Sequence, residues 1–304
     1  MVTRNYIPGD EWLYYKIYCG AKTADEIITQ VILPVSIVLK DQNKIDKFFF
    51  IRYSDPDLHL RVRFHFNTAD DIGSIMYAMN EGLISFVNSN KVWKVMLDTY
   101  KRELERYHPS LIEYAEDLFC IDSETIALFL DLIDGTDGDK IRWMFSFRSI
   151  DALLSDFGFS IEQKQAFTEK LKEAFASEFG MNKSLRLQLD QRYRAVKSNI
   201  LFIMNLTEEN AGEYMPLIEL LEQRSNRNIK VVCAINEAQK KDKNIDIAGL
   251  LSSYIHMLMN RTFRSKQRLH ELVIYDFLFR FYTSEIAKEK YRTSSLSGNA
   301  VSTQ

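Results

Sequence analysis

Residues 58–66 alternate strictly between apolar and basic side chains, and this segment constrains the fold more than any other. Leu58, Leu60, Val62, Phe64 and Phe66 alternate with His59, Arg61, Arg63 and His65. Because successive side chains on a strand point to opposite faces, the pattern predicts a strand with one apolar and one basic face. Two neighbouring guanidinium groups on such a strand suit a carboxylate or a phosphate. The simpler interpretation is a half-exposed sheet whose solvated face is basic.

The segment before this strand predicts that it belongs to a hairpin. Residues 47–53 include Phe48, Phe49 and Phe50 and are typical of a buried strand. A turn is expected at 54–57, where Pro56 presets the backbone dihedral φ. An aromatic-rich segment at 12–19 predicts a further strand. We therefore expect an antiparallel sheet near the N-terminus, with a β-hairpin at about 47–66.

Beyond the hairpin, apolar residues recur with helical periodicity. The expected fold class is α+β, predominantly helical, with the sheet at the N-terminus. Pro34 is a candidate kink within the helix expected at 24–39. A short strand is expected at 229–232. Helices are expected at 24–39, 70–88, 92–107, 110–119, 123–134, 138–155, 161–178, 184–195, 208–224 and 247–282, the last with a break near 262–265.

No linker rich in Pro, Gly or Ser interrupts residues 10–290, so a single domain is expected there. The last segment, 293–304, is small and polar and is predicted to be a disordered tail. With 304 residues, of which 46% are hydrophobic, the chain can bury a large core.

Composition and motifs exclude several classes of function. A formal charge of −3 argues against a dedicated nucleic-acid binder. Cys19, Cys120 and Cys233 lie far apart, which indicates reduced, buried thiols and a cytoplasmic protein. No apolar run is long enough to span a bilayer. No phosphate-binding glycine loop or zinc-ligand spacing occurs, and we expect neither a metal nor a cofactor.

His256 lies opposite the apolar stripe on a helical wheel of residues 247–260, together with Ser252, Ser253 and Asn260. This polar face could line a cleft and present an imidazole as an acid or base. An ordinary solvated helix face is the alternative.

The helix expected at 92–107 shows a similar arrangement. Arg102 and Arg106 lie one turn apart, away from its apolar stripe. They could add a third cation to an anion pocket. Solvated surface charge is again the alternative.

Four phrases of the sequence resemble the C-terminal domain of LanB-type lantibiotic dehydratases. They are Trp-Leu-Tyr-Tyr-Lys-Ile-Tyr at 12–18, Phe-Phe-Ile-Arg-Tyr-Ser-Asp-Pro at 49–56 with His-Leu-Arg-Val-Arg at 59–63, Tyr-Lys-Arg-Glu-Leu-Glu-Arg-Tyr at 100–107 and His-Met-Leu-Met-Asn-Arg at 256–261. The same domain occurs as a freestanding thiopeptide-type bacteriocin biosynthesis protein. The resemblance extends from Trp12 to Tyr282.

The resemblance implies elimination of glutamate from a glutamylated precursor peptide, which leaves dehydroalanine or dehydrobutyrine. A separate glutamylating LanB-type protein, which uses glutamyl-tRNA, would be the partner. No stable nucleic-acid binding by this chain is implied, and a homodimer is one option by analogy.

By position in the motifs, Arg63 and Arg102 resemble the glutamate-binding arginines of this family, and His256 resembles its catalytic histidine. Arg61 is an alternative to Arg63 as the main glutamate ligand. Further candidate substrate-binding residues are Arg52, Tyr53, Asn260 and Arg106, of which the first three would support the residues that contact the ligand. The chain departs from the family pattern after Tyr107, where His108-Pro109 replaces a Gly pair. This departure puts Arg102 in doubt.

Two other functions fit the same resemblance. Related enzymes build the pyridine core of thiopeptides by a formal [4+2] cycloaddition with loss of the leader peptide. A non-catalytic peptide-binding partner of the glutamylating protein is the second alternative. Retention of the arginines and of His256 favours elimination.

Overall fold

A computed structural model describes residues 2–133 and 138–299. The chain forms two compact units, each described by itself. The first comprises residues up to 142 together with 213–267, and the second comprises 143–212 together with the chain from 268 on. All of the predicted site residues belong to the first unit.

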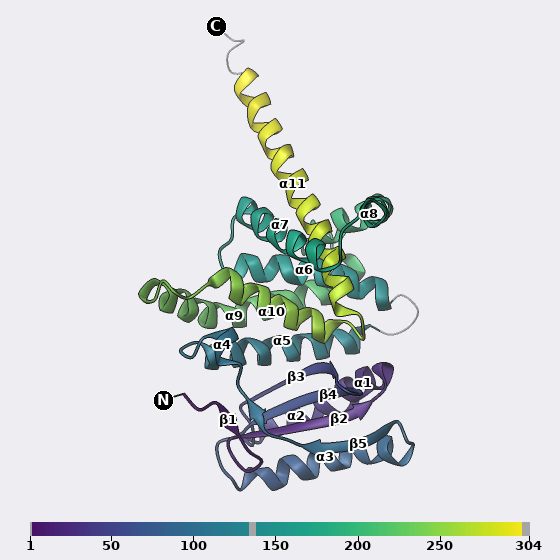
Figure 1. The fold of residues 1–304 in the computed structure, drawn as a ribbon, viewed down its shortest axis with the longest axis vertical. Helices are drawn as coiled ribbons and strands as arrows, with labels where there is room; N and C mark the ends of the chain where they lie inside the picture. The colour runs from purple at the N-terminus through teal and green to yellow at the C-terminus, as the bar shows by residue number, and fades with distance from the viewer. Residues whose placement is uncertain (1, 134–137, 300–304) are drawn as a thin grey trace. The chain divides into compact units, whose positions relative to one another are not determined.

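The first unit is built on a four-stranded antiparallel sheet (Figure 1). Its strands, in spatial order, are β3 (Lys47–Ser54), β4 (Leu58–His65), β2 (Trp12–Cys19) and β5 (Val92–Leu97). The predicted hairpin is confirmed as β3 and β4, in which Phe49 lies opposite Arg63. A small ladder joins β1 (Asn5–Tyr6) to β6 (Tyr100–Lys101).

The alternation along β4 separates the two faces of the sheet as predicted. Leu60, Val62 and Phe64 are fully buried. The apolar side of the sheet packs against α3 (Asp71–Asn88) and the helical segment that follows β2. A Cβ on Gly82 of α3 would approach Val31 to 2.4 Å, so this contact needs glycine.

The segment that follows β2 is helical through Pro34. It consists of α1 (Ala21–Ile27), a π-helical turn (Ile28–Ile32) and α2 (Leu33–Asp41). A proline inside a helix lacks an N–H and crowds the carbonyl four residues earlier. The wider π turn directly before α2 accommodates both effects, so the helix continues past the predicted kink.

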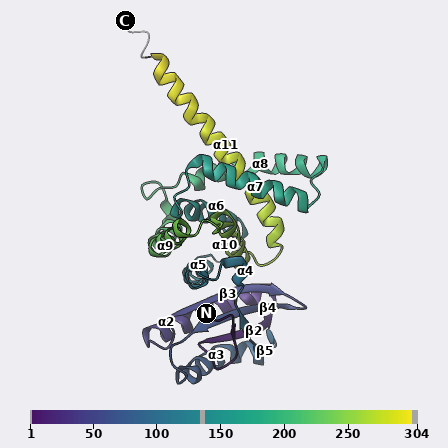
Figure 2. The ribbon, with the colours of Figure 1, turned by 60° about the vertical axis from the view of Figure 1, so that its left-hand side comes forward.

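The open edge of β3 is covered by helices of the same unit. Figures 1 and 2 show α5 (Ile112–Leu132) beside β3, and α10 (Ile247–Thr262) also contacts this strand. Ser123 Oγ accepts a hydrogen bond from the Phe50 N–H at 3.2 Å, and Arg261 Nε donates to the Phe50 carbonyl at 2.9 Å. Asn260 bonds both the N–H and the carbonyl of Arg52, each at 2.8 Å. Side chains thus satisfy the backbone groups that a missing neighbour strand would otherwise have paired.

Three expectations from the sequence were wrong. The helix predicted at 92–107 is instead β5, β6 and the short α4 (Leu104–Tyr107). Pairing with β2 outweighs the helical spacing of its apolar residues, because strand preference depends on tertiary context. The strand predicted at 229–232 lies inside α9 (Met215–Lys241), which a 3₁₀ turn (Gly212–Tyr214) precedes. The helices predicted at 110–119 and 123–134 form the single helix α5.

The secondary-structure elements among the described residues of the second unit are all helices. Its elements are the part of α6 (Gly138–Asp156) from residue 143 on, α7 (Ile161–Glu178), α8 (Lys183–Met204) and α11 (Gln267–Asn299). Lys164 Nζ and Tyr282 Oη both donate to Asp151 Oδ1, at 2.6 and 2.9 Å. This ties α6, α7 and α11 together. The predicted break near 262–265 is confirmed by the end of α10 and the start of α11.

The prediction of a single domain over 10–290 stays a prediction, because two compact units can still fold as one. The same holds for the predicted disordered tail: α11 continues to Asn299, and residues 300–304 lie outside the described residues. Cys19 and Cys120 are buried as expected, whereas Cys233 is exposed on α9. None of the helices within 2–133 and 138–299 has both the length and the apolar character needed to cross a bilayer.

A buried carboxylate, Asp25 on α1, gathers three arginines from distant parts of the first unit. Arg52 Nη2, Arg142 Nη2 and Arg264 Nε donate to its oxygens at 2.5, 2.6 and 2.5 Å. Burial by itself would raise the pKa of Asp25, but the three guanidinium groups outweigh it and hold this pKa below its usual value. Asp25 therefore links β3, α6 and the residues after α10.

Replacing this carboxylate is expected to destabilise the fold. Asp25→Asn would leave buried guanidinium charges without their counterion, a loss of about 3–5 kcal/mol in the free energy of unfolding at pH 7. Because the folded-state pKa lies below the unfolded value, the contribution is complete above about pH 4 and is lost as the pH falls through the folded pKa. Denaturant unfolding measured from pH 7 to pH 3 should therefore show the difference between wild type and variant shrinking.

A matched control is Glu237→Gln, which removes the carboxylate of an exposed pair with Lys240. Its unfolding midpoint should stay at the wild-type value. Equal stability of wild type and Asp25→Asn at pH 7 would contradict the role assigned to this cluster.

Candidate functional site

Arg63 lies in a box of aromatic rings on the basic face of the sheet. Its guanidinium carbon is 4.3 Å from the ring centre of Tyr14, 5.0 Å from that of Phe49 and 4.8 Å from that of Tyr100. The register places Tyr14 and Phe49 directly opposite Arg63 on the two neighbouring strands. Only 7% of Arg63 is exposed. The rings attract the cation through their π faces and shield it from water.

The guanidinium of Arg63 forms no ion pair and no hydrogen bond with any described residue. Its Nε is fully buried without an acceptor. Burial lowers the pKa of Arg63, and the carboxylate of Glu103 has only a small opposing effect on it. A buried charge normally has a partner, because removing it from water costs several kcal/mol. Arg63 is therefore a candidate binding site for an anion, because no described residue supplies one.

Arg61 provides a second cation on the same face, two residues along β4. Its guanidinium stacks 3.4 Å from the ring centre of Tyr53, and its Nε donates to His59 Nε2 at 3.1 Å. His59 Nδ1 lies 2.8 Å from the Asp57 carbonyl, to which it donates as the neutral tautomer. Burial lowers the pKa of His59, in agreement with this neutral state. Arg61 is half-buried and has no carboxylate partner among the described residues.

Arg102, in contrast, already binds a carboxylate. Its Nε and Nη2 donate to Glu116 Oε1 and Oε2 at 2.7 and 2.6 Å, a bidentate and buried ion pair. The hydroxyl of Tyr100 donates to the same Glu116 at 2.8 Å. Burial, and the negative charge of Glu116, raise the pKa of Tyr100 well above its usual value. Arg102 thus fixes Glu116, which fixes one wall of the box around Arg63.

Helix α10 presents the polar face that the sequence predicted. His256, Ser253 and Asn260 are all half-buried along it. Asn260 holds the edge of β3 through the backbone of Arg52, and Ser253 Oγ accepts a hydrogen bond from Arg106 Nε at 3.1 Å. His256 lies between these two contacts, since residues three and four apart share one helix face. The anchored helix therefore holds the imidazole within the same unit as the two β4 arginines.

The remaining predicted residues have partners within the fold. The Arg52 side chain bonds Asp25 and the Arg261 carbonyl, and Tyr53 lies under Arg61. Sequence reasoning missed the residues that surround Arg63, namely Tyr14, Phe49, Tyr100 and Glu116. The aromatic alternation of the neighbouring strands was a signal for Tyr14 and Phe49, because cross-strand partners share a face.

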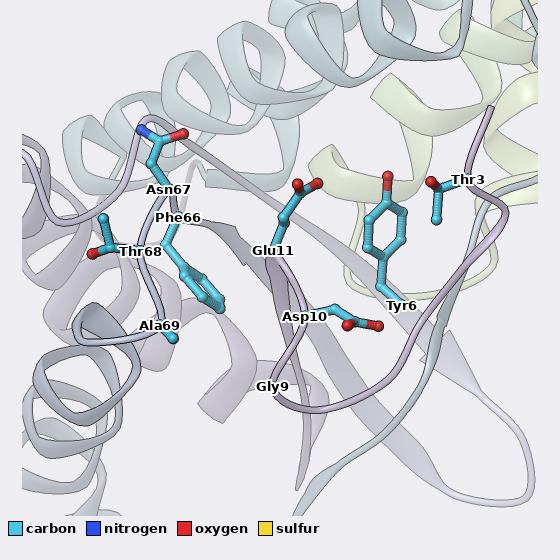
Figure 3. Close-up of a pocket in the computed structure, with 9 residues that line it drawn as sticks. All are labelled: Thr3, Tyr6, Gly9, Asp10, Glu11, Phe66, Asn67, Thr68 and Ala69. Atoms are coloured by element: carbon cyan, nitrogen blue, oxygen red, sulfur yellow. The ribbon is translucent and has the colours of Figure 1, made fainter. Parts of the chain in front are cut away.

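Two cavities lie outside the predicted site residues. The one in Figure 3, of about 300 Å³, is lined at the N-terminus by Tyr6, Asp10 and Glu11, and by residues 66–69. It adjoins Arg102, whose guanidinium lies 5.0 Å from the Tyr6 ring centre. Its two carboxylates would repel an anion. The other cavity, of about 440 Å³, is an apolar groove between α3 and β5.

Within the described part of the chain, no three His, Cys, Asp or Glu side chains come together in a group that could hold a metal ion. The candidate site consists instead of guanidinium groups, aromatic rings and one imidazole-bearing helix face.

Comparison with known proteins shows the family of the chain. A sequence model of the family described as "Lantibiotic biosynthesis dehydratase C-term" matches residues 12–282. The subtilin biosynthesis protein SpaB of Bacillus subtilis is 26% identical over 271 residues, which cover 88% of this chain and 25% of SpaB. The chain thus spans about a quarter of the length of this relative.

Solved structures share the fold. The tRNA-dependent lantibiotic dehydratase MibB from Microbispora sp. 107891 superposes with a TM-score of 0.70 at 20% identity, covering 95% of this chain and 29% of MibB. The pyridine synthase TbtD from thiomuracin biosynthesis superposes with a TM-score of 0.65 at 10% identity, covering 90% of this chain and 99% of TbtD.

The contrast between the two buried arginines can be tested through stability. Arg63→Met removes a buried charge that has no counterion and keeps apolar contact with the rings, so the unfolding free energy should be unchanged or higher. Arg102→Met leaves Glu116 buried without its cation and should cost about 3–5 kcal/mol. Denaturant unfolding of both variants measures the difference. Equal and large losses would mean that Arg63 has a counterion inside the fold.

Proposed function

Because the chain belongs to the lantibiotic biosynthesis dehydratase C-terminal family, we propose that it eliminates glutamate from glutamylated Ser or Thr residues of a precursor peptide. The products would be dehydroalanine or dehydrobutyrine and free glutamate. The observation that carries the proposal is Arg63, a buried guanidinium in an aromatic box without a carboxylate of its own. A glutamyl group supplies a carboxylate of matching charge and shape.

The reaction needs three events at the modified residue. A base removes the Cα proton, the electron pair forms the Cα–Cβ double bond, and the Cβ–O bond breaks with release of glutamate as a carboxylate. We assign the proton transfer to His256, which the half-buried face of α10 presents. We assign binding of the glutamyl carboxylates to Arg63 and Arg61. Their positive charge would also stabilise the enolate-like charge that develops on the peptide.

We assign the other predicted residues to support of this site. Direct binding of substrate by Arg102 would require displacement of Glu116 from a bidentate ion pair. In the proposal, Arg102 holds Glu116 in place, and Glu116 in turn holds the Tyr100 ring beside Arg63. Asn260 holds α10 to β3, Arg52 is bound to Asp25, and Arg106 contacts α10 at Ser253. The ring of Tyr53 stacks against the guanidinium of Arg61 and holds it in place.

The proposed elimination needs a peptide that has already been glutamylated. We propose that a separate LanB-type protein glutamylates the precursor peptide from glutamyl-tRNA and that this chain acts on the product. Stable nucleic-acid binding is then not required of this chain, and the reaction would take place in the cytoplasm.

Pyridine synthesis is the second candidate, because TbtD matches this chain over 99% of its own length. A cycloaddition between two dehydrated residues consumes no glutamyl group. It would leave Arg63 without an evident ligand, so the buried cation favours elimination.

The experiment is incubation of the purified protein with a synthetic peptide that carries one glutamyl-Ser ester, without tRNA or ATP. Loss of glutamate, followed by mass spectrometry, should be observed. Arg63→Met should slow it by about 10²–10³-fold and His256→Ala by about 10²–10⁴-fold, because they remove charge stabilisation and proton transfer. Arg186→Met, which removes an exposed cation in the second unit, should react like wild type.

An intact ester after incubation with wild type, with or without a glutamylating partner, would overturn the proposal. Wild-type rates in Arg63→Met would overturn the assignment of the binding site. A product that has lost its leader segment and gained an aromatic ring would establish the pyridine alternative.

A further inference from the structure

The two edge strands of the sheet differ in whether their outward backbone groups form hydrogen bonds. On β3, side chains of α5 and α10 occupy the outward backbone groups of Phe50 and Arg52. On β5, the opposite edge strand, only the side facing β2 is paired. The Asp98 N–H donates to the Tyr14 carbonyl, so by alternation the backbone groups of Val95 and Leu97 point outward. No described residue forms a hydrogen bond with them.

The surface beside this open edge is apolar, which is unusual for an edge strand exposed to water. Trp93 is 54% exposed and Val95 is 40% exposed. Next to them the 440 Å³ groove is lined from α3 by Met76, Met79, Leu83, Ile84 and Val87. Such a groove accepts apolar side chains from a strand added to β5.

The opposite face of the same edge is basic. Lys94 lies 5.3 Å from the Tyr18 ring centre and forms no ion pair with a described residue. The register places Arg61 and Lys16 on this face, with Arg61 opposite Lys16 and Lys16 opposite Met96. Lys16 is paired with Asp98, whereas Lys94 and Arg61 have no carboxylate partner among the described residues. Residues of an added strand that point to this face would therefore meet positive charge.

From these observations we propose that β5 docks an extended peptide segment in which apolar side chains alternate with acidic ones. An apolar residue opposite Val95 enters the groove against α3, and one opposite Leu97 lies on the same face. Acidic residues opposite Lys94 and Met96 lie on the basic face. Backbone hydrogen bonds to the outward groups of β5 supply affinity that does not depend on sequence, and the alternation supplies specificity. The inference rests on the proposed function in one respect, that the substrate is a peptide.

The docked segment lies within reach of the candidate site. An added strand would follow β4, β2 and β5 in the sheet. At a strand spacing of about 4.8 Å it lies about 14 Å from β4, the strand that carries Arg63. The end of β5 at Leu97 adjoins Tyr15, next to Tyr14, which lies opposite Arg63. A further five or so extended residues past that end span this distance. The edge thus holds the peptide at a fixed separation from the residue to be modified.

Binding can be measured without any chemistry at the candidate site. The probe is a fluorescein-labelled nine-residue peptide of alternating Glu and Val or Leu, without Ser, Thr or a glutamyl group. Controls are a peptide of the same composition with all apolar residues at one end, and one with Lys in place of Glu. Fluorescence anisotropy should show saturable binding of the alternating acidic peptide, and binding at least about tenfold weaker for each control.

Variants of the edge separate backbone pairing from side-chain contact. Val95→Pro removes an outward N–H and leaves the hydrogen bonds to β2 in place, and it should weaken binding at least about tenfold. Ile84→Glu, at a half-exposed position of the groove, should weaken it as well and keeps the strand unchanged. Lys94→Glu should reverse the preference between the Glu and Lys peptides. Tyr77→Ser, at a 68% exposed position of α3 outside the groove lining, is the matched control and should bind like wild type.

Equal binding of the alternating and segregated peptides, or wild-type affinity in both Val95→Pro and Ile84→Glu, would overturn the proposal. So would a dimer in sedimentation that Val95→Pro dissociates, because a second copy of the chain would then occupy the edge. Elimination of glutamate from a short glutamyl-Ser peptide that lacks the alternating segment is measured separately. Failure of either experiment therefore leaves the other interpretable.

Discussion

The hydrogen bonds from Asn260 and Arg261 to the edge of β3 are the constraint on which the candidate site depends. An edge strand needs partners for its outward backbone groups, and here a helix far along the sequence provides them through side chains. This need fixes both the height and the rotation of α10 relative to the sheet. One turn before Asn260 the same helix face carries His256. The position of the imidazole thus follows from the hydrogen bonds that α10 makes to the edge of β3.

Two arginines of the same unit illustrate how burial alone does not define a role. Arg102 and Arg63 are similarly buried and both lie against aromatic rings. Arg102 is neutralised by Glu116, and the pair behaves as an internal cross-link. Arg63 has rings where a carboxylate would be expected. The first arrangement stabilises the fold. The second leaves a buried cation that no described residue neutralises, and in the proposed function a substrate carboxylate neutralises it.

The sequence predicted the parts of this structure that depend on local pattern. The alternation at 58–66, together with the aromatic run and turn before it, predicted the hairpin and the two-faced sheet. The helical wheel placed His256 on the polar side of its helix, and the structure shows that this side is half-buried. The region 92–107 was misjudged because its apolar spacing suits a helix, while its actual conformation depends on an open edge of β2. The pairing of Arg102 with Glu116 joins two elements through tertiary contact, and no spacing along the chain indicates it.

The different energetic status of the two arginines bears on how related chains are compared. Any relative that keeps Glu116 buried would retain Arg102, whatever reaction it carries out. Loss of Arg102 would leave the buried Glu116 carboxylate without a counterion. Arg63 has no such counterion among the described residues, so its replacement is expected to leave the fold intact. A lineage that abandoned the proposed reaction would then lose Arg63 by drift at no structural disadvantage. Under the proposed function, arginine at this position is therefore a more informative marker of the reaction than Arg102.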